Sequence, residues 1–369
     1  MHWLFIPILS LLVSVQSLLL AFRVKSRSPP YDKLYYEYFS HRHWKAAEDL
    51  CKQQSGTLAT VSNSAENQQL TSILKYWNIS HPVWIGRKIL THQKKDSSMI
   101  WILDFSRSLD QTYARLLHKF PSMSSVTICT QLLFNPNSFG ISTIFSYSVN
   151  DFQLRANLAQ GRPVQLALLI HGKQGSYAEA FEHDNSWHSV CVSWSQDGGR
   201  WALYAHGHLV SSGNGVNSND DIIGPNGSFI LGERQNGGSF MSNDSFRGSI
   251  TELHIWDRVL SSCEILTMEN ECSTISSGLV LRWSEASLEI EVSLGRLQGK
   301  SPCQEKFTDF KVDLFNSSLD GTWKNQTFTL EVLQRKMVHE DCRVFDPVTE
   351  SCGVENCSSF KGVICQFKK

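Results

Sequence analysis

Ten cysteines are the residues whose chemistry is easiest to predict in this 369-residue chain. Cysteines can pair as disulfides or hold zinc, but no Cys-x-x-Cys pair occurs, and the surroundings of Cys352 and Cys357 do not fit a zinc site. An even number of cysteines behind a secretory signal predicts disulfides. The ten are Cys51, Cys129, Cys191, Cys263, Cys272, Cys303, Cys342, Cys352, Cys357 and Cys365.

The sequence contains no comparable residue pattern in favour of catalysis. His188 could act as a base, but no nucleophile motif accompanies it, so it reads as a buried, hydrogen-bonded strand residue. The chain contains no Gly-x-Ser-x-Gly, no His-Glu-x-x-His, no phosphate-binding glycine loop and no paired-carboxylate motif. We therefore predict that the protein is not an enzyme. Its 34 basic and 35 acidic residues nearly cancel, which gives no electrostatic reason to expect nucleic acid or an anionic membrane as a partner.

The first residues have the profile of a signal peptide. An apolar run extends through Phe22 and is stopped by Arg23, and we expect cleavage after Ser17, with Ala21 as the second choice. The alternative is an uncleaved anchor, because the run approaches the length of a bilayer span. No later apolar run reaches the roughly 18 residues of a membrane helix, so we expect no span after the signal and a secreted, extracellular protein.

Six Asn-x-Ser/Thr sequons fit the same compartment, because glycosylation marks exposed sites of secreted proteins. They are Asn78, Asn226, Asn243, Asn316, Asn325 and Asn356.

Two kinds of element must position these residues. Near the amino terminus, the apolar residues of His43–Lys52 form one helical stripe, and Ser62 followed by Glu66 predicts the start of a second helix, with a strand between the two. From Met123 onward, short alternating or β-branched stretches separated by Gly, Asn and Asp turns predict a β-sandwich or jelly roll.

The predicted strands include 126–133, 144–149, 164–170, 189–194 and 200–204. Only Ser261–Glu269 reads as a helix in this part, and Ser211–Asp221 reads as a surface loop. Trp187, Trp194 and Trp256 are predicted to be core aromatics rather than ligand platforms.

The run Trp187-His-Ser-Val-Cys-Val-Ser-Trp-Ser195 resembles the signature of the pentraxin family, His-x-Cys-x-Ser/Thr-Trp-x-Ser/Thr. Two further blocks, 227–240 and 246–260, resemble the same family in the same order. The resemblance implies a pentraxin-like jelly roll in which Cys129 pairs with Cys191.

It also implies a calcium site, because pentraxins bind ligands through calcium held by carboxylate and amide oxygens. The positions that correspond to the family's ligands are Asn150, Asp151, Gln235, Asn236 and Asp244. Arg234 stands where a carboxylate is expected, and Met241 replaces another ligand. Two ligands are thus lost and a cation is added, so the family's calcium pattern is degenerate here and no cofactor is firmly predicted.

The two ends of the chain resemble a C-type lectin domain. The blocks Trp44–Cys51, Gly56–Val61, Val83–Gly86 and Trp101–Asp104 follow the order of its first half, and the closing segment resumes at Glu340. The resemblance implies the pairs Cys51–Cys365 and Cys342–Cys357, and hence one α+β lectin-like domain interrupted by the sandwich. Such insertions are tolerated in surface loops. The alternative is a truncated lectin half followed by a complete pentraxin-like domain and an unrelated cysteine-rich tail.

Sugar binding by C-type lectins needs a Glu-Pro-Asn or Gln-Pro-Asp loop and a Trp-Asn-Asp strand, and the chain has neither. Cys272, Gly278–Trp283 and Cys303 resemble the segment after the pentraxin domain of adhesion G-protein-coupled receptors. The expected divisions are 1–22 for the signal, 34–104 and 336–369 for the lectin-like halves, 113–276 for the pentraxin-like domain and 277–335 for a connection.

Three hypotheses follow. The first is an extracellular adhesion or recognition module for a protein or glycan, as a soluble form or fragment of a receptor ectodomain. The second is a soluble calcium-dependent pentraxin of the humoral-immunity type, which would assemble into a ring. The third, a secreted hydrolase on a lectin-like sandwich, has no motif in its favour. The sequence leaves the pairing of Cys263, Cys272, Cys303 and Cys352 open.

Overall fold

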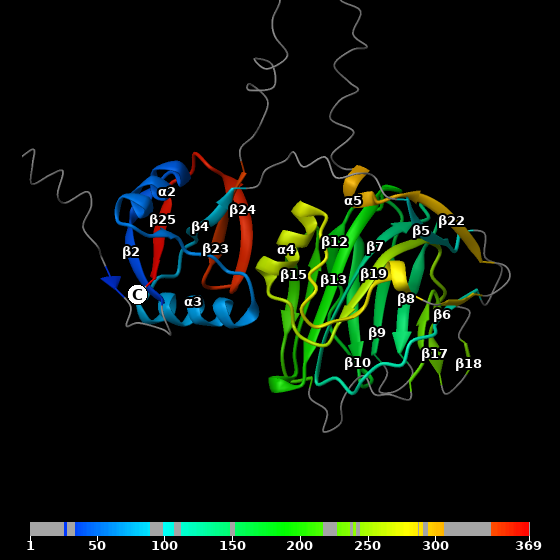
Figure 1. Ribbon diagram of the computed structural model, residues 1–369. Coiled ribbons are helices and arrows are strands. Elements are labelled where there is room, and N and C mark those ends of the chain that lie inside the picture. Colours follow the sequence, from blue (N-terminus) through cyan, green and yellow to red (C-terminus); the bar gives the residue numbers. More distant parts are fainter. Residues whose placement is uncertain are drawn as a thin grey trace, which may run out of the picture. The chain divides into compact units, whose positions relative to one another are not determined.

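A computed structural model describes most of the chain, and its residues fall into two compact units (Figure 1). One unit comes from residues 1–90 and 318–369, and the other from 91–317. The described residues are 26–27, 34–88, 99–106, 112–147, 152–216, 227–236, 239–240, 244–286, 288–290, 294–305 and 341–368. Within them, no helix has the length and apolar character to cross a membrane.

The smaller unit is an α+β domain built from both ends of the chain. Its last strand, β25, lies between β2 and β4 in the sheet order β1-β2-β25-β4-β23-β24, with β3 also paired to β25. The helices α2 and α3 accompany this sheet (Figure 1). The elements are β1 (Ser26–Arg27), β2 (Leu34–Arg42), α2 (Trp44–Gln53), β3 (Thr57–Leu58), α3 (Ser64–Tyr76), β4 (Val83–Lys88), β23 (Asp341–Asp346), β24 (Ser351–Asn356) and β25 (Lys361–Lys368).

Local sequence explains both helices. The stripe predicted for the first helix buries Trp44, Ala47 and Leu50 against the sheet. The cap of the second helix lies one residue later than predicted. Asn63 rather than Ser62 caps it, because the Asn63 side chain accepts a hydrogen bond from the backbone N–H of Glu66 at 2.9 Å.

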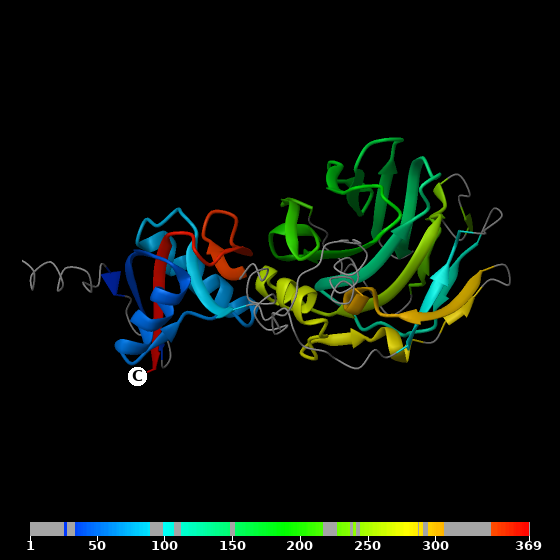
Figure 2. The same ribbon diagram turned by 90° about the horizontal axis from the view of Figure 1, so that it is seen from above.

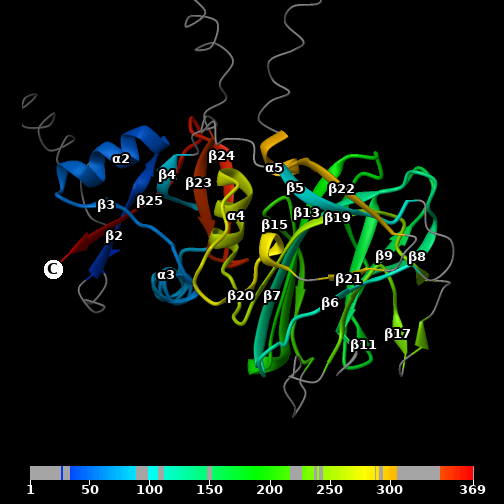
Figure 3. The same ribbon diagram turned by 45° about the vertical axis from the view of Figure 1, so that its right-hand side comes forward.

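The larger unit is a jelly-roll sandwich of two sheets. One sheet has the order β11-β10-β9-β8-β16-β6-β21, with β12 paired to β10, and the other has the order β15-β14-β13-β7-β19-β5-β22, with β20 paired to β19. Buried residues of both sheets form a single hydrophobic core, so the sheets pack face to face (Figures 1 and 3). The mainly-β fold class with an interrupted α+β domain is confirmed.

The strands of the first sheet are β6 (Ala114–Leu116), β8 (Gly140–Tyr147), β9 (Phe152–Leu158), β10 (Val164–Ile170), β11 (Lys173–Gln174), β12 (Ala178–Phe181), β16 (Phe229–Leu231) and β21 (Leu288–Ile290). Those of the second are β5 (Met99–Asp104), β7 (Ser125–Phe134), β13 (Trp187–Ser195), β14 (Arg200–Ala205), β15 (His208–Gly213), β19 (Gly248–Trp256), β20 (Leu279–Leu281) and β22 (Gly295–Lys300). A separate pair joins β17 (Gln235–Asn236) to β18 (Ser239–Phe240), and the short helices are η1 (Asp197–Gly199), α4 (Ser262–Glu271), η3 (Trp283–Glu285) and α5 (Pro302–Glu305).

Three expectations differ from this arrangement. Trp101–Asp104, expected in the lectin-like half, lies in β5, which pairs with β19 and β22 of the sandwich. Part of the expected connection 277–335 forms β20, β21 and β22, because these stretches hydrogen-bond to sandwich strands. Ser211 belongs to β15, which pairs antiparallel with β14, rather than to a loop.

Alternation along the strands decides which residues lie under α4. In β7 and β13, Val126, Ile128 and Trp194 point into the sandwich core, whereas Cys129 and Cys191 point to the outer face. Helix α4, yellow-green in Figures 2 and 3, covers this outer face, where the two cysteines share a hydrophobic cluster with its residue Ile265.

Candidate functional site

Two places on the larger unit carry polar groups that could recognise a ligand. The first is the loop edge where the family's calcium site is expected, formed by β9, β16 and β17. The second is a cavity on the outer face of the second sheet, beneath α4.

At the loop edge, Asp244 is held by two arginines. Nη2 of Arg155 on β9 donates to Oδ2 of Asp244 at 2.7 Å, and Nη1 of Arg234 lies 3.6 Å from the same oxygen. The Arg155 side chain is 12% exposed and that of Arg234 is 29% exposed, so the pairing with Arg155 is less screened by water than the one with Arg234. A carboxylate that ligates calcium would have to give up these partners.

Gln235 is also occupied. Its amide nitrogen donates to the backbone carbonyls of Ser228 at 3.0 Å and Ser146 at 3.2 Å, which turns the amide toward the strands. The neighbouring Glu233 is fully buried, and its Oε1 accepts a hydrogen bond from the Ser245 hydroxyl at 2.6 Å. The structure therefore uses these carboxylate and amide groups to link strand ends to one another.

The structure describes the other candidate calcium residues only in part. Asn236 lies in β17, but nothing is described of its side chain, and Asn150, Asp151 and Met241 lie outside the described residues. In the part of the chain that is described, no three His, Cys, Asp or Glu side chains gather as a metal site would require. Whether calcium binds stays a prediction.

Sequence reasoning missed Arg155, which lies 89 positions before Asp244. No motif marks it. The alternation of β9 would have placed its side chain away from the core residues Leu154 and Ala156, but only the sheet order brings it to the candidate ligands.

His188 of the signature is buried, as its strand position suggested. Its ring stacks on Phe181 with centroids 4.0 Å apart, and its two nitrogens lie 3.0 Å from Nε2 of His206 and 2.9 Å from Oδ1 of Asp184. Burial alone would raise the pKa of Asp184, but the hydrogen bonds from His188 and from the Ser186 backbone outweigh it and lower that pKa. Trp194 and Trp256 are fully buried, whereas Trp187 is partly exposed.

Four disulfides are described within the units. Cys51–Cys365 and Cys342–Cys357 join elements of the smaller unit, and Cys129–Cys191 joins β7 to β13, which are the pairs that the family resemblances implied. The fourth is Cys272–Cys303, a pair that the sequence left open.

Two sequons lie in the described part, and both are exposed. Asn78 follows α3 in the left-handed conformation, with φ of 56°, and Asn356 ends β24. Asn226, Asn243, Asn316 and Asn325 lie outside the described residues, so glycosylation of all six stays a prediction.

The fold and these sites define a class: an extracellular-type recognition protein that combines a jelly-roll sandwich with a lectin-like domain. Residues 102–294 match the Pentaxin family, and residues 40–135 match the Lectin C-type domain. The chain belongs to the pentaxin family, the pentraxins, and carries a split C-type lectin-like domain beside the pentraxin domain.

The curated relatives that this chain resembles are longer proteins. The chain is 30% identical over 261 residues to the human adhesion G protein-coupled receptor D2, covering 68% of this chain and 26% of the receptor. It is 31% identical over 179 residues to the human neuronal pentraxin receptor, covering 48% of this chain and 35% of that protein. The chain therefore spans about a quarter to a third of these relatives.

Among solved structures, the chain is similar to a native heptameric pentraxin from Limulus polyphemus. The match has 24% identity and a TM-score of 0.48, and it covers 55% of this chain and 95% of the other. The Pentaxin and Lectin C-type families consist generally of binding modules, in agreement with a role in extracellular recognition.

Proposed function

We propose that this protein is an adhesion and recognition module that binds an extracellular protein or glycan without catalysis and without calcium at the loop edge. We further propose that it acts outside the cell as a soluble form, or as a fragment, of an adhesion-receptor ectodomain. The similarity to the adhesion receptor D2 and the two recognition domains support the receptor relationship.

The ion pairs of Asp244 carry the calcium-independent part of the proposal. Calcium needs six to eight oxygen ligands. Here the carboxylate of Asp244 pairs with Arg155 and faces Arg234, so calcium binding would require separating these charges and placing a dication beside two guanidinium groups. A ligand that reaches this edge would instead meet the partly exposed Arg234, on an edge that the Gln235 amide ties to the strands.

Binding of the full chain to cultured cells and to extracellular matrix tests the function. We expect saturable binding that is the same in calcium and in EGTA, and no heat on titration of the chain with millimolar calcium. Binding that EGTA abolishes, or calcium heat that saturates, would support the soluble calcium-dependent pentraxin instead.

A matched pair of glutamine variants tests whether the loop edge makes the contact. Gln235→Ala removes an amide from this edge, whereas Gln160→Ala changes an exposed glutamine that follows β9. We expect Gln235→Ala to weaken cell binding and Gln160→Ala to leave it unchanged. Equal binding by all variants would argue against recognition through this edge.

A further inference from the structure

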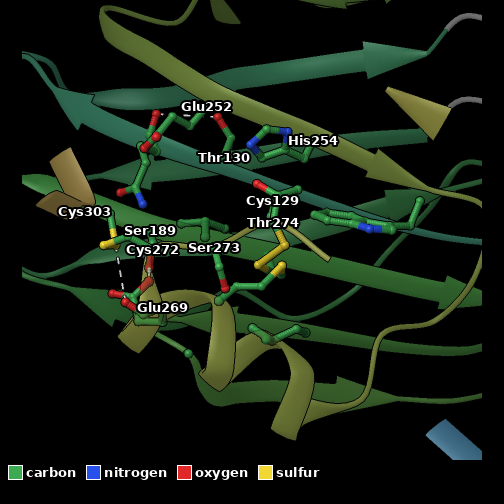
Figure 4. Close-up of a pocket in the computed structure, with 17 residues that line it drawn as sticks. Cys129, Thr130, Ser189, Glu252, His254, Glu269, Cys272, Ser273, Thr274 and Cys303 are labelled. Atoms are coloured by element: carbon green, nitrogen blue, oxygen red, sulfur yellow. Dashed lines mark hydrogen bonds between the residues drawn. A yellow bond between two sulfur atoms is a disulfide. The ribbon is translucent and has the colours of Figure 1, made fainter. Parts of the chain in front are cut away.

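A cavity lies on the outer face of the second sheet, beneath α4 and beside two disulfides (Figure 4). Its volume is about 80 Å³, and it is partly open to solvent. Cys129–Cys191 forms part of its wall, and Cys272–Cys303 fastens the end of α4 beside it. The larger unit alone contributes the residues that line it.

A β-bulge brings the first acidic group to this cavity. Thr251 pairs with Gln131 and His254 pairs with Cys129, so β19 has one residue more than β7 between these pairs. At the bulge, Glu252 takes a φ of 49°. The alternation of β19 side chains between the two faces therefore shifts by one position. Leu253 stays in the core, and Glu252 lines the outer face.

Helix α4 brings the second acidic group. Glu269 lies in its last turns and lines the cavity, where its Oε2 accepts a hydrogen bond from the Ser189 hydroxyl at 2.5 Å. Oε1 of Glu252 accepts from the Ser301 hydroxyl at 2.8 Å.

Gln131 gives the independent sign of a ligand. This β7 side chain lines the cavity and is 8% exposed, and its Oε1 is buried with no hydrogen-bond partner. Leaving a buried acceptor unpaired costs about 1–3 kcal/mol, so such atoms normally have a partner. The missing partner must be a hydrogen-bond donor.

The charge of the lining selects the kind of donor. Two carboxylates line the cavity, but none of its 17 lining residues is a lysine or an arginine. His206 lies near one carboxylate, with Nδ1 3.7 Å from Oε1 of Glu269, and contributes a positive charge only when protonated. Trp256 and Met268 add apolar surface for an aliphatic stem.

We propose that this cavity binds the cationic head of a lysine or arginine side chain presented by a protein partner. An ammonium or guanidinium group carries donors and no acceptor, which matches the unpaired Gln131 oxygen and the carboxylates of Glu252 and Glu269. The source of the basic group, a protein partner, is the one part of this inference that rests on the recognition function proposed above.

Small cations test the cavity without a known partner. The full chain is titrated with n-butylammonium and n-butylguanidinium, and binding is followed by ligand-observed NMR, with butyrate and 1-pentanol as comparison probes. We expect saturable binding of at least one cation and none of the two comparison probes. The cation that binds more tightly identifies the side chain. Failure of both cations to bind saturably, or equal binding of 1-pentanol, would overturn the inference.

Variants locate the binding. Glu252→Gln and Glu269→Gln keep the side-chain shape, and Gln131→Met removes the unpaired acceptor. Each is expected to weaken cation binding about tenfold, the effect of losing one hydrogen bond to a charged group. Glu271→Gln, at an exposed position of α4 outside the lining, is the control and should bind like the parent chain. Binding that is the same in all four variants contradicts the site.

Cell binding by the same variants separates this inference from the proposed function. If the parent chain binds cells and Glu252→Gln and Glu269→Gln bind equally well, the partner does not use the cavity and the recognition function stands. If the cations bind as expected but the parent chain binds no cells or matrix, the recognition function fails and the cavity remains a cation site.

Discussion

Acid should destabilise the pentraxin domain through His254. This residue lies in β19, where its Nδ1 accepts a hydrogen bond from the backbone N–H of Trp283 at 3.3 Å. Burial of the ring and then the positive charge of Arg282 lower the pKa of His254 to about 4. A protonated ring would present an N–H to Trp283 in place of an acceptor, so the fold keeps His254 neutral.

The sign and size of the effect follow from linkage. An unfolded histidine has a pKa of about 6.5, so below that pH the unfolded chain binds a proton that the folded chain does not. Stability therefore falls as the pH drops from about 6.5 toward 4. One pKa unit corresponds to about 1.4 kcal/mol, which gives a loss of roughly 1.4 kcal/mol at pH 5.5 and roughly 2.5 kcal/mol at pH 4.5.

His254→Asn isolates this contribution, because asparagine keeps an acceptor near the position of Nδ1 and does not titrate. The chain is equilibrated in urea at pH 7.0, 5.5 and 4.5 and then labelled by a short hydrogen-exchange pulse at one fixed pH. Mass spectrometry of peptides from β13 and β19 reports the unfolded fraction of this domain alone.

We expect the acid-dependent loss to be smaller in His254→Asn by about 2.5 kcal/mol at pH 4.5. His208→Asn, at an exposed position of β15, is the matched control and should lose as much stability as the parent chain. Equal acid losses in the parent chain and His254→Asn would refute the reasoning.

Three further predictions concern the fold. Arg155→Met should lower the free energy of unfolding in urea by about 3 kcal/mol, because it leaves Asp244 partly buried without its closest cation. The double variant with Asp244→Asn should recover most of that loss, and failure to recover it would contradict the ion-pair account. Replacing Cys51 and Cys365 with alanine should cost about 2–5 kcal/mol, measured by thermal unfolding of the lectin-like domain, because their bond joins residues 314 positions apart; an unchanged transition would count against it. Ser261→Ala should cost about 1 kcal/mol because Ser261 closes the capping box of α4, and Ser261→Asp, which keeps a cap, should restore stability in the same urea assay.

The sequence determined the fold class to a large extent, because the evidence for it is local. Strand alternation and turn residues marked β7, β10, β13 and β14, and helical spacing marked α2 and α3. The signature around Cys191 identified the family because it combines core positions with one disulfide. These features depend on neighbours within about ten residues, so they are legible without the tertiary structure.

Elements whose place depends on distant partners were assigned less well. Trp101–Asp104 fitted a lectin pattern, but its hydrogen-bond partners in β19 and β22 lie about 150 and 195 positions away and place it in the sandwich. β-Strands need a neighbour for their backbone hydrogen bonds, and a short strand shows little of which neighbour it will find.

The candidate sites divide in the same way. The sequence by itself showed that Arg234 had entered the pattern of calcium ligands, because substitution is visible at a single position. Only the tertiary structure added Arg155 from another strand, and only it placed the unpaired oxygen of Gln131 beside Glu252 and Glu269. The physical reason is that charge pairing, burial and an unsatisfied acceptor are properties of atoms brought together across sheets, whereas a motif records only residues that are adjacent along the chain.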